Sequence, residues 1–203
     1  MDFENFSDIE EKRSDVFEVR VEAAKEFKEK GNKFFKDNDF FNAEYFYHVG
    51  LYHIDFDHLQ WNFELLDKHR EEVLSVKTPI CLNLAAVRIK LKNYPKAICL
   101  CDEVLKDDKN NAKAFYRKAQ AQKCLKNYDD ALVSINKAES LAKAKEVIEL
   151  RNEIKQLLRA ENQKFKKMWK GKLIPKPKNF TLMKFLSYIN PLNLHFRLFP
   201  LVI

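Results

Sequence analysis

The chain has 203 residues, of which 46% are hydrophobic and 33% charged, and it contains only three Gly and six Pro. This length is enough for one medium-sized domain with a core of its own. So little Gly and Pro argues against an all-β sandwich, a dinucleotide-binding α/β fold and a disordered linker protein. No two glycines lie close enough to form a phosphate-binding loop. We therefore expect an all-α fold.

The formal net charge of +7 is concentrated in the C-terminal part of the chain. No Asp or Glu follows Glu161, whereas nine Lys or Arg do. Residues 1–163 carry 28 basic and 30 acidic side chains, so this part is close to neutral. The high overall pI is therefore no sign of a nucleic-acid-binding domain, and we expect no nucleic acid partner.

Residues 1–17 are an acidic lead without an apolar run, so we expect no secretory signal. The chain has four cysteines in apolar helical patterns with no paired framework. We interpret all four as small buried hydrophobic residues in a reducing compartment, which predicts a cytoplasmic protein. They are Cys81, Cys99, Cys101 and Cys124.

A short pattern recurs three times within residues 18–143: a polar turn, an aromatic residue and, three residues later, an alanine. It occupies residues 38–43, 92–97 and 126–131. Ala97 and Ala131 are 34 residues apart, and Ala43 and Ala97 are 54 apart, which is one period plus an insertion of 20. A 34-residue period with this turn is typical of tetratricopeptide repeats, each a helix–turn–helix. The alanine is required where the second helix crosses the first closely.

The repeats are predicted over about 18–55, 78–111 and 112–143, with the first helix from about Val19 to Asp37. The insertion, residues 56–77, has a helical pattern, and we expect it to lengthen the second helix of repeat one and the first helix of repeat two. Thr78 and Pro79 have the pattern of an N-cap followed by the first helical position.

A terminal amphipathic helix is predicted within residues 144–172, from about Lys145 to Lys170. A right-handed solenoid of repeats needs such a cap, because its last repeat otherwise exposes an apolar face. The apolar residues expected along one side of this helix are Val147, Ile148, Ile154, Leu157, Leu158, Phe165 and Trp169.

Residues 173–203 form a basic and apolar tail for which we expect little order. Seven Lys lie within residues 164–178, among apolar residues. Such a segment can be the solvated end of the capping helix, dock into calmodulin, or bring the protein to an anionic membrane surface. Lys184, Asn190-Pro191 and Arg197 interrupt the apolar run that follows, so a transmembrane helix is not expected. That run is either a disordered end or an interfacial segment.

The first helices of three stacked repeats line a concave groove, and polar residues on that lining are candidates for a binding site. Lys28 and Asn32 lie four residues apart in repeat one and share a helix face. Asn83 lies in the first helix of repeat two. Lys113 and Arg117 again lie four apart in repeat three.

At these five positions the sequence resembles the carboxylate-clamp tetratricopeptide domains of chaperone adaptors. In that family the same residue types bind the C-terminal Glu-Glu-Val-Asp tail of heat-shock protein 90 or heat-shock protein 70. The resemblance implies that Lys28, Asn32, Asn83, Lys113 and Arg117 bind such a tail here. Phe35 and Ala86 lie three residues after the two asparagines and are expected to form apolar contacts with the ligand.

Within this group the likeness is to the large immunophilin type, over about residues 20–170. It rests on the strings at 29–32, 82–86 and 165–169 and on the long insertion. The calmodulin alternative for the basic segment also comes partly from this likeness. Only about 20 residues precede the repeats, whereas a prolyl-isomerase domain needs roughly 100, so isomerase activity is not expected.

The chemistry of the five residues fits an acidic peptide end independently of the resemblance. Lys supplies point charges, Arg a planar fork, and Asn both a donor and an acceptor. Charge-assisted hydrogen bonds of about 1.5–3 kcal/mol each could together give micromolar binding, about −8 kcal/mol. The five histidines lack metal-ligand spacing, and no catalytic or cofactor motif is present. We therefore expect a non-enzymatic adaptor; the alternatives are a scaffold for another partner and a degenerate prolyl isomerase.

Overall fold

The computed structural model of the chain describes residues 12–170, with only the backbone described for 168–170. Within this range the structure is helical and contains no strand. The helices are α1 (Phe17–Lys36), α2 (Phe40–His53), a π-helical turn η2 (Gln60–Glu64), α3 (Asp67–Lys90), α4 (Tyr94–Asp107), α5 (Ala112–Cys124), α6 (Tyr128–Leu141) and α7 (Lys145–Lys170). The all-α prediction is confirmed.

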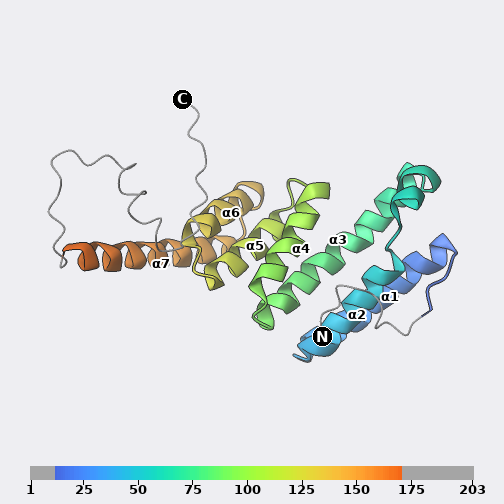
Figure 1. Cartoon of the computed structure of the whole chain (residues 1–203), viewed down its shortest axis with the longest axis horizontal. Coiled ribbons are helices and arrows are strands. Elements are labelled where there is room, and N and C mark those ends of the chain that lie inside the picture. Colours follow the sequence, from blue (N-terminus) through green and yellow to red (C-terminus); the bar gives the residue numbers. More distant parts are fainter. Residues whose placement is uncertain (1–11, 171–203) are drawn as a thin grey trace, which may run out of the picture. The chain divides into compact units, whose positions relative to one another are not determined.

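Six of these helices form three hairpins. The helices α1 and α2, α3 and α4, and α5 and α6 pack against each other in pairs (Figure 1). Successive hairpins are joined by packing of α2 on α3 and of α4 on α5. The first helices of the repeats also pack together, α3 contacting both α1 and α5. Residues 1–161 form one compact unit, which holds the three hairpins and most of α7.

The polar turns inside the hairpins have the same backbone geometry. Asn38, Lys92 and Lys126 adopt φ values of 61°, 62° and 64°. This left-handed conformation ends the first helix of each hairpin and reverses the chain. The side chains of Asp39 and Asn93 then cap the start of α2 and α4 by accepting from a backbone N–H three residues on. The turn pattern in the sequence thus marks three equivalent bends.

The repeat alanines lie where the sequence predicts. Ala43, Ala97 and Ala131 are all 0% exposed, because each faces the other helix of its hairpin or the neighbouring one. In the first hairpin Gly31 makes an even closer crossing possible. A Cβ on Gly31 would lie 2.6 Å from Cε1 of Tyr47, so a larger residue would force the two helices apart.

The prediction for Thr78 and Pro79 is wrong. The helix α3 begins at Asp67, twelve residues earlier, and Pro79 lies inside it. A proline inside a helix loses one backbone hydrogen bond. Here the helix continues because its apolar face, including Val73, Val76 and Ile80, is buried on both sides of the proline.

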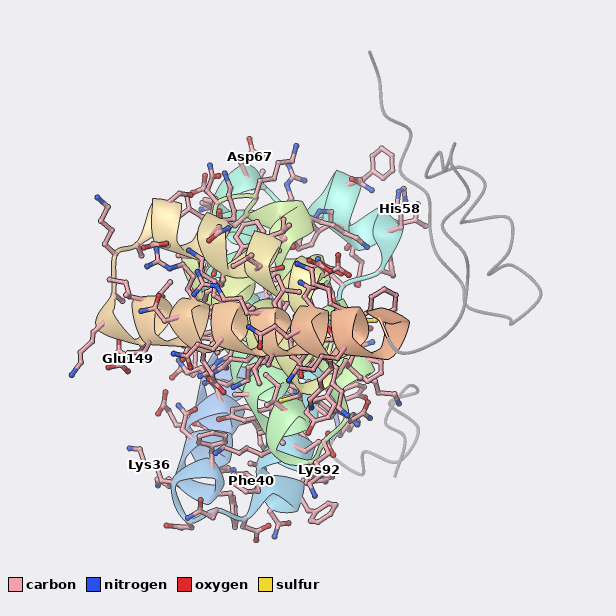
Figure 2. The ribbon with its side chains drawn as sticks, turned by 90° about the vertical axis from the view of Figure 1, so that its left-hand side faces the viewer. Lys36, Phe40, His58, Asp67, Lys92 and Glu149 are labelled. Carbon is pink, nitrogen blue, oxygen red and sulfur yellow. The ribbon has the colours of Figure 1, made fainter. Side chains whose placement is uncertain are left out.

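The insertion lengthens the first helix of repeat two, as predicted, but not the second helix of repeat one, which ends at His53. Between these helices the chain forms η2 instead. Figure 2 shows that His58 and Asp67, which flank the insertion, lie at the opposite end of the hairpins from Lys36 and Phe40, where α1 turns into α2.

The interpretation of the cysteines is correct for only two of the four. Cys81 and Cys101 are buried, and burial raises the pKa of each thiol to about 12. Cys99 and Cys124 are exposed. Cys99 is two residues from Cys101 and so points to the opposite face of α4, and Cys124 is the last residue of α5.

The helix α7 spans Lys145–Lys170, and its buried residues differ from those expected. Val147, Leu150 and Ile154 are buried against α5 and α6. Ile148 is 37% exposed and Phe165 is 48% exposed, because the packed stripe is narrower than the apolar pattern and stops before Phe165. Leu157 and Leu158 are half-buried. The Trp169 side chain and the predicted tail, 173–203, lie outside the described residues.

Candidate functional site

Two of the residues predicted to bind a ligand meet across the first two repeats. The side-chain amide of Asn83 on α3 donates to the Oδ1 oxygen of Asn32 on α1 at 2.9 Å. The two residues are 51 positions apart in the chain. Both are half-buried, so the pair lies at the surface between two packed helices and not in the core.

A third side chain, Tyr47 on α2, fixes the orientation of this pair. Its hydroxyl donates to the same Oδ1 of Asn32 at 2.7 Å. Tyr47 is 1% exposed, and burial raises its pKa to about 12, so the hydroxyl remains a donor at ordinary pH. With Oδ1 taken by two donors, the Nδ2 group of Asn32 has to face the other way.

The Nδ2 group of Asn32 donates to a carboxylate of the chain itself. It lies 3.2 Å from Oε2 of Glu29, and the other carboxylate oxygen, Oε1, lies 3.3 Å from Nζ of Lys28. The hydrogen bond from Asn32 and the contact with Lys28 together lower the pKa of the Glu29 carboxyl group. Lys28 and Asn32, both predicted to bind a peptide carboxylate, therefore hold an internal one in the free chain.

The remaining two predicted residues form a second group on α5. Ala114, next to Lys113, is buried against Cys81 and Leu82 of α3, which places the first turn of α5 beside the part of α3 that carries Asn83. Within residues 12–170 no hydrogen bond or ion pair joins this second group to Lys28, Asn32 or Asn83.

Arg117 is close enough to Lys113 to affect the protonation of its ammonium group. Burial lowers the pKa of Lys113, and the positive charge of Arg117 lowers it further. Burial also lowers the pKa of Arg117. One guanidinium nitrogen, Nη1, donates to Gln120 Oε1 at 3.0 Å, and the buried Nε–H has no acceptor within the described part of the chain. A cationic pair with unused donors is suited to an anion.

The two predicted apolar contact residues differ in how much surface they offer. Phe35 is half-buried and packs on the core of the first hairpin, with its ring 5.6 Å from that of Phe40. Ala86 is only 5% exposed, so little of it is accessible to a ligand.

Sequence reasoning missed Tyr47 and Glu29. Both are visible in the sequence only through spacing: Tyr47 follows the repeat alanine by four residues, and Glu29 lies between Lys28 and Asn32. It also missed a cavity of about 520 Å³ bordered by α2, the insertion, α3 and α4. Its lining includes Trp61, Cys81 and Leu100, along with the ion pair Lys77–Glu103 at 2.8 Å.

No group of three or more His, Cys, Asp or Glu in the described residues could hold a metal ion. The described helices also include none that is long and apolar enough to cross a membrane.

No model of a known protein family matches the chain. Among curated proteins it is 36% identical over 163 residues to the peptidyl-prolyl cis-trans isomerase FKBP42 of Arabidopsis thaliana, covering 78% of this chain and 43% of that protein. It is 34% identical over 105 residues to human sperm-associated antigen 1, covering 51% of this chain and 11% of that protein. The chain thus spans less than half the length of these relatives.

Solved structures with the same fold include a domain of an FK506-binding protein, a multi-domain immunophilin and a domain of yeast Sti1. The tetratricopeptide-containing domain of a putative FK506-binding protein of Plasmodium falciparum gives a TM-score of 0.63 at 30% identity, covering 74% of this chain and 96% of that one. A multi-domain immunophilin of Arabidopsis thaliana gives 0.57 at 35% identity, covering 61% and 47%. The TPR2B domain of yeast Sti1, solved as a pHsp70 complex, gives 0.51 at 25% identity, covering 66% of this chain and 97% of that one.

The Plasmodium domain is matched over nearly its whole length at an identity that marks common ancestry. This chain shares one helical architecture with that domain and with the Sti1 domain. The chain therefore belongs to the family of tetratricopeptide-repeat domains found in FK506-binding proteins of the immunophilin type.

Proposed function

We propose that the chain is a non-enzymatic co-chaperone adaptor that binds the acidic C-terminal tail of heat-shock protein 90 or heat-shock protein 70. The peptide end would lie along α1, α3 and α5. Its terminal carboxylates would contact Lys28, Asn32, Asn83, Lys113 and Arg117, and its apolar side chains would lie beside Phe35.

The observation that carries this proposal is that Lys28 and Asn32 already hold a carboxylate. Glu29 receives an ammonium at 3.3 Å and an amide at 3.2 Å from them. These are the two donors that an acidic peptide end would use on α1. Asn83 is hydrogen-bonded to the same amide, which supports a single site shared by α1 and α3.

The cationic pair on α5 supplies the second half of the interaction. A C-terminal aspartate carries two carboxylates on one residue, and Lys113 and Arg117 together offer a point charge and a planar fork. Arg117 Nε–H has no acceptor in the described part of the free chain, so a carboxylate placed there would satisfy a buried donor. The complex of yeast Sti1 with Hsp70 supports the same use of this fold.

The test is a calorimetric titration of the 203-residue chain with the peptide Met-Glu-Glu-Val-Asp. We expect binding that weakens steeply with added salt. Lys113→Ala or Arg117→Ala should each weaken binding by more than about 1.5 kcal/mol, because each removes a charge-assisted bond. Lys137→Ala removes the same charge from an exposed position on α6 and should leave the affinity nearly unchanged.

Absence of binding to the tail peptides of both chaperones at low salt would remove the proposal and favour a scaffold for another partner. A peptide with an amidated C-terminus should bind more weakly than the free acid. Equal affinities for the amidated and the free peptide would show that the site does not recognise the terminal carboxylate.

We also propose that the chain has no prolyl-isomerase activity. Residues 12–170 are taken up by the three hairpins, the insertion and α7. An assay of proline isomerisation with the 203-residue chain should give the uncatalysed rate.

The expected docking of residues 164–178 to calmodulin or to a membrane surface concerns a segment mostly beyond the described residues and stays a prediction.

A further inference from the structure

We propose that Glu29 is an internal competitor that sets the affinity of the site, because its carboxylate occupies Lys28 and Asn32 until a ligand displaces it. The inference rests on the proposed function, since it concerns the same two donors. Nothing in the sequence resemblance gives this residue a role.

The carboxylate of Glu29 contacts both donors at once. The two oxygens of Glu29 are divided between two donors, Oε1 toward Nζ of Lys28 and Oε2 toward Nδ2 of Asn32. The Glu29 side chain is 62% exposed, so it can leave for water without disturbing the core. The depressed pKa of its carboxyl group agrees with these two contacts.

Asn32 cannot avoid the competition by turning its amide. Its Oδ1 accepts from Tyr47 at 2.7 Å and from Asn83 at 2.9 Å. A rotated amide would present hydrogens to both of these donors. Only the Nδ2 side is therefore open to a carboxylate, and Glu29 already lies there.

A ligand carboxylate that reaches Lys28 while Glu29 remains in place would meet a second negative charge within a few ångströms. Like charges at that distance repel even in water. Either the ligand displaces Glu29, or the two carboxylates share the ammonium of Lys28 and their repulsion makes binding less favourable. In both cases the carboxylate of Glu29 weakens the binding of an acidic peptide.

The size of the effect follows from the exposure of the contact. An exposed ion pair changes an equilibrium constant by at most about fivefold. Glu29→Gln keeps the shape of the side chain and removes its charge. We expect the variant to bind Met-Glu-Glu-Val-Asp about threefold to fivefold more tightly than the unchanged chain.

The matched control is Glu26→Gln. Glu26 is an exposed residue of the same helix, three positions earlier, and makes no hydrogen bond or ion pair within the described residues. Its replacement removes the same charge from nearly the same place. It therefore measures the long-range effect of charge alone, which should be smaller than that of Glu29→Gln and should vanish in moderate salt.

Nuclear magnetic resonance gives an independent measurement on the free chain. The side-chain amide signal of Asn32 should shift in Glu29→Gln and stay in place in Glu26→Gln. The Glu29 carboxyl group should titrate below its ordinary range in the free chain and at higher pH once the peptide is bound.

The possible outcomes separate the two proposals. If the unchanged chain binds the peptide but Glu29→Gln binds no more tightly than Glu26→Gln, the competitor role is wrong and the adaptor function stands. If neither the chain nor any variant binds the peptide, the adaptor function fails and the competitor role falls with it. Tighter binding by Glu29→Gln together with the Asn32 shift supports both.

Discussion

Asn32 is the residue at which three helices of the first two repeats meet. Its oxygen receives Tyr47 from α2 and Asn83 from α3, and its nitrogen faces Glu29 on its own helix, α1. The oxygen and the NH₂ group of an asparagine amide are similar in size, so hydrogen-bond partners decide which way the amide faces. In Asn32 the two donors to Oδ1 fix the orientation of the amide. These donors, Tyr47 and Asn83, lie far from each other in the sequence.

The hydroxyl of Tyr47 can be removed without changing the packing of its ring. Tyr47→Phe should lower the free energy of unfolding by about 1 kcal/mol, the usual contribution of one hydrogen bond. It should also weaken peptide binding severalfold, because Asn32 keeps only Asn83 to hold its amide. Chemical denaturation and calorimetry measure the two effects. Tyr128→Phe, in the third repeat, should change the peptide affinity little, and an equal loss there would argue against a positioning role for Tyr47.

Sequence reasoning selected Asn32 and Asn83 from their register in the repeats, and the structure joins them. It did not select Tyr47 or Glu29. A buried tyrosine in an apolar helix looks like a core residue, and a glutamate on a charged helix looks like a solvated one. Tyr47 and Glu29 matter because both contact Asn32, one from the neighbouring helix and one from the same helix. The sequence does not give these distances.

The crossing of α1 and α2 depends on the absence of a side chain at one position. A Cβ on Gly31 would lie 2.6 Å from Cε1 and 2.7 Å from Cδ1 of Tyr47. The aromatic ring is buried and cannot move aside. A larger residue at this position would therefore displace the ring whose hydroxyl reaches Asn32.

Gly31→Ala should lower the free energy of unfolding by about 1–3 kcal/mol, the cost of overpacking a core. It should weaken peptide binding as well, since the Tyr47 hydroxyl moves with the ring. Gly50→Ala is the comparison, because a Cβ there would first meet the Cδ1 end of Ile80, at 3.2 Å. A gain in helix propensity of up to about 1 kcal/mol offsets that contact. Thermal denaturation of both variants checks this, and similar losses would contradict it.

At the level of helices, the sequence pattern located the hairpins but misplaced one helix start. The turns at 38–43, 92–97 and 126–131 lie where predicted because each combines a left-handed residue with a buried alanine. The start of α3 was misplaced because Thr78-Pro79 fits an N-cap by local rules. The burial of Val73 and Val76, which outweighs those rules, depends on neighbouring helices that a local pattern does not include.

Across the whole described unit, each hairpin contacts only its neighbours. The helices α1 and α2 pack on α3, and the core formed by α5, α6 and α7 is a separate cluster. In a stack of this kind stability is close to a sum of local contributions. A substitution in one hairpin should therefore lower the stability mainly of that hairpin and its direct neighbour.

Ile154→Ala tests this expectation. Ile154 is fully buried, so its truncation should lower the free energy of unfolding by about 2–5 kcal/mol. Hydrogen exchange should become faster in α5 and α6 while α1 and α2 keep their protection. The exposed Ile148→Ala should have a much smaller effect. Uniformly faster exchange in all three hairpins would mean that the unit unfolds as one piece and not repeat by repeat.

The helix α3 borders the cavity beside the insertion and also carries a candidate site residue. Cys81 and Leu84 line the cavity beside the insertion, and Asn83, between them in sequence, is directed toward α1. A single turn of α3 thus carries both lining residues of the cavity and the donor of the hydrogen bond to Asn32. Because these residues share one turn of a helix, a ligand or substitution that displaces Cys81 or Leu84 would also change the distance between Asn83 and Asn32.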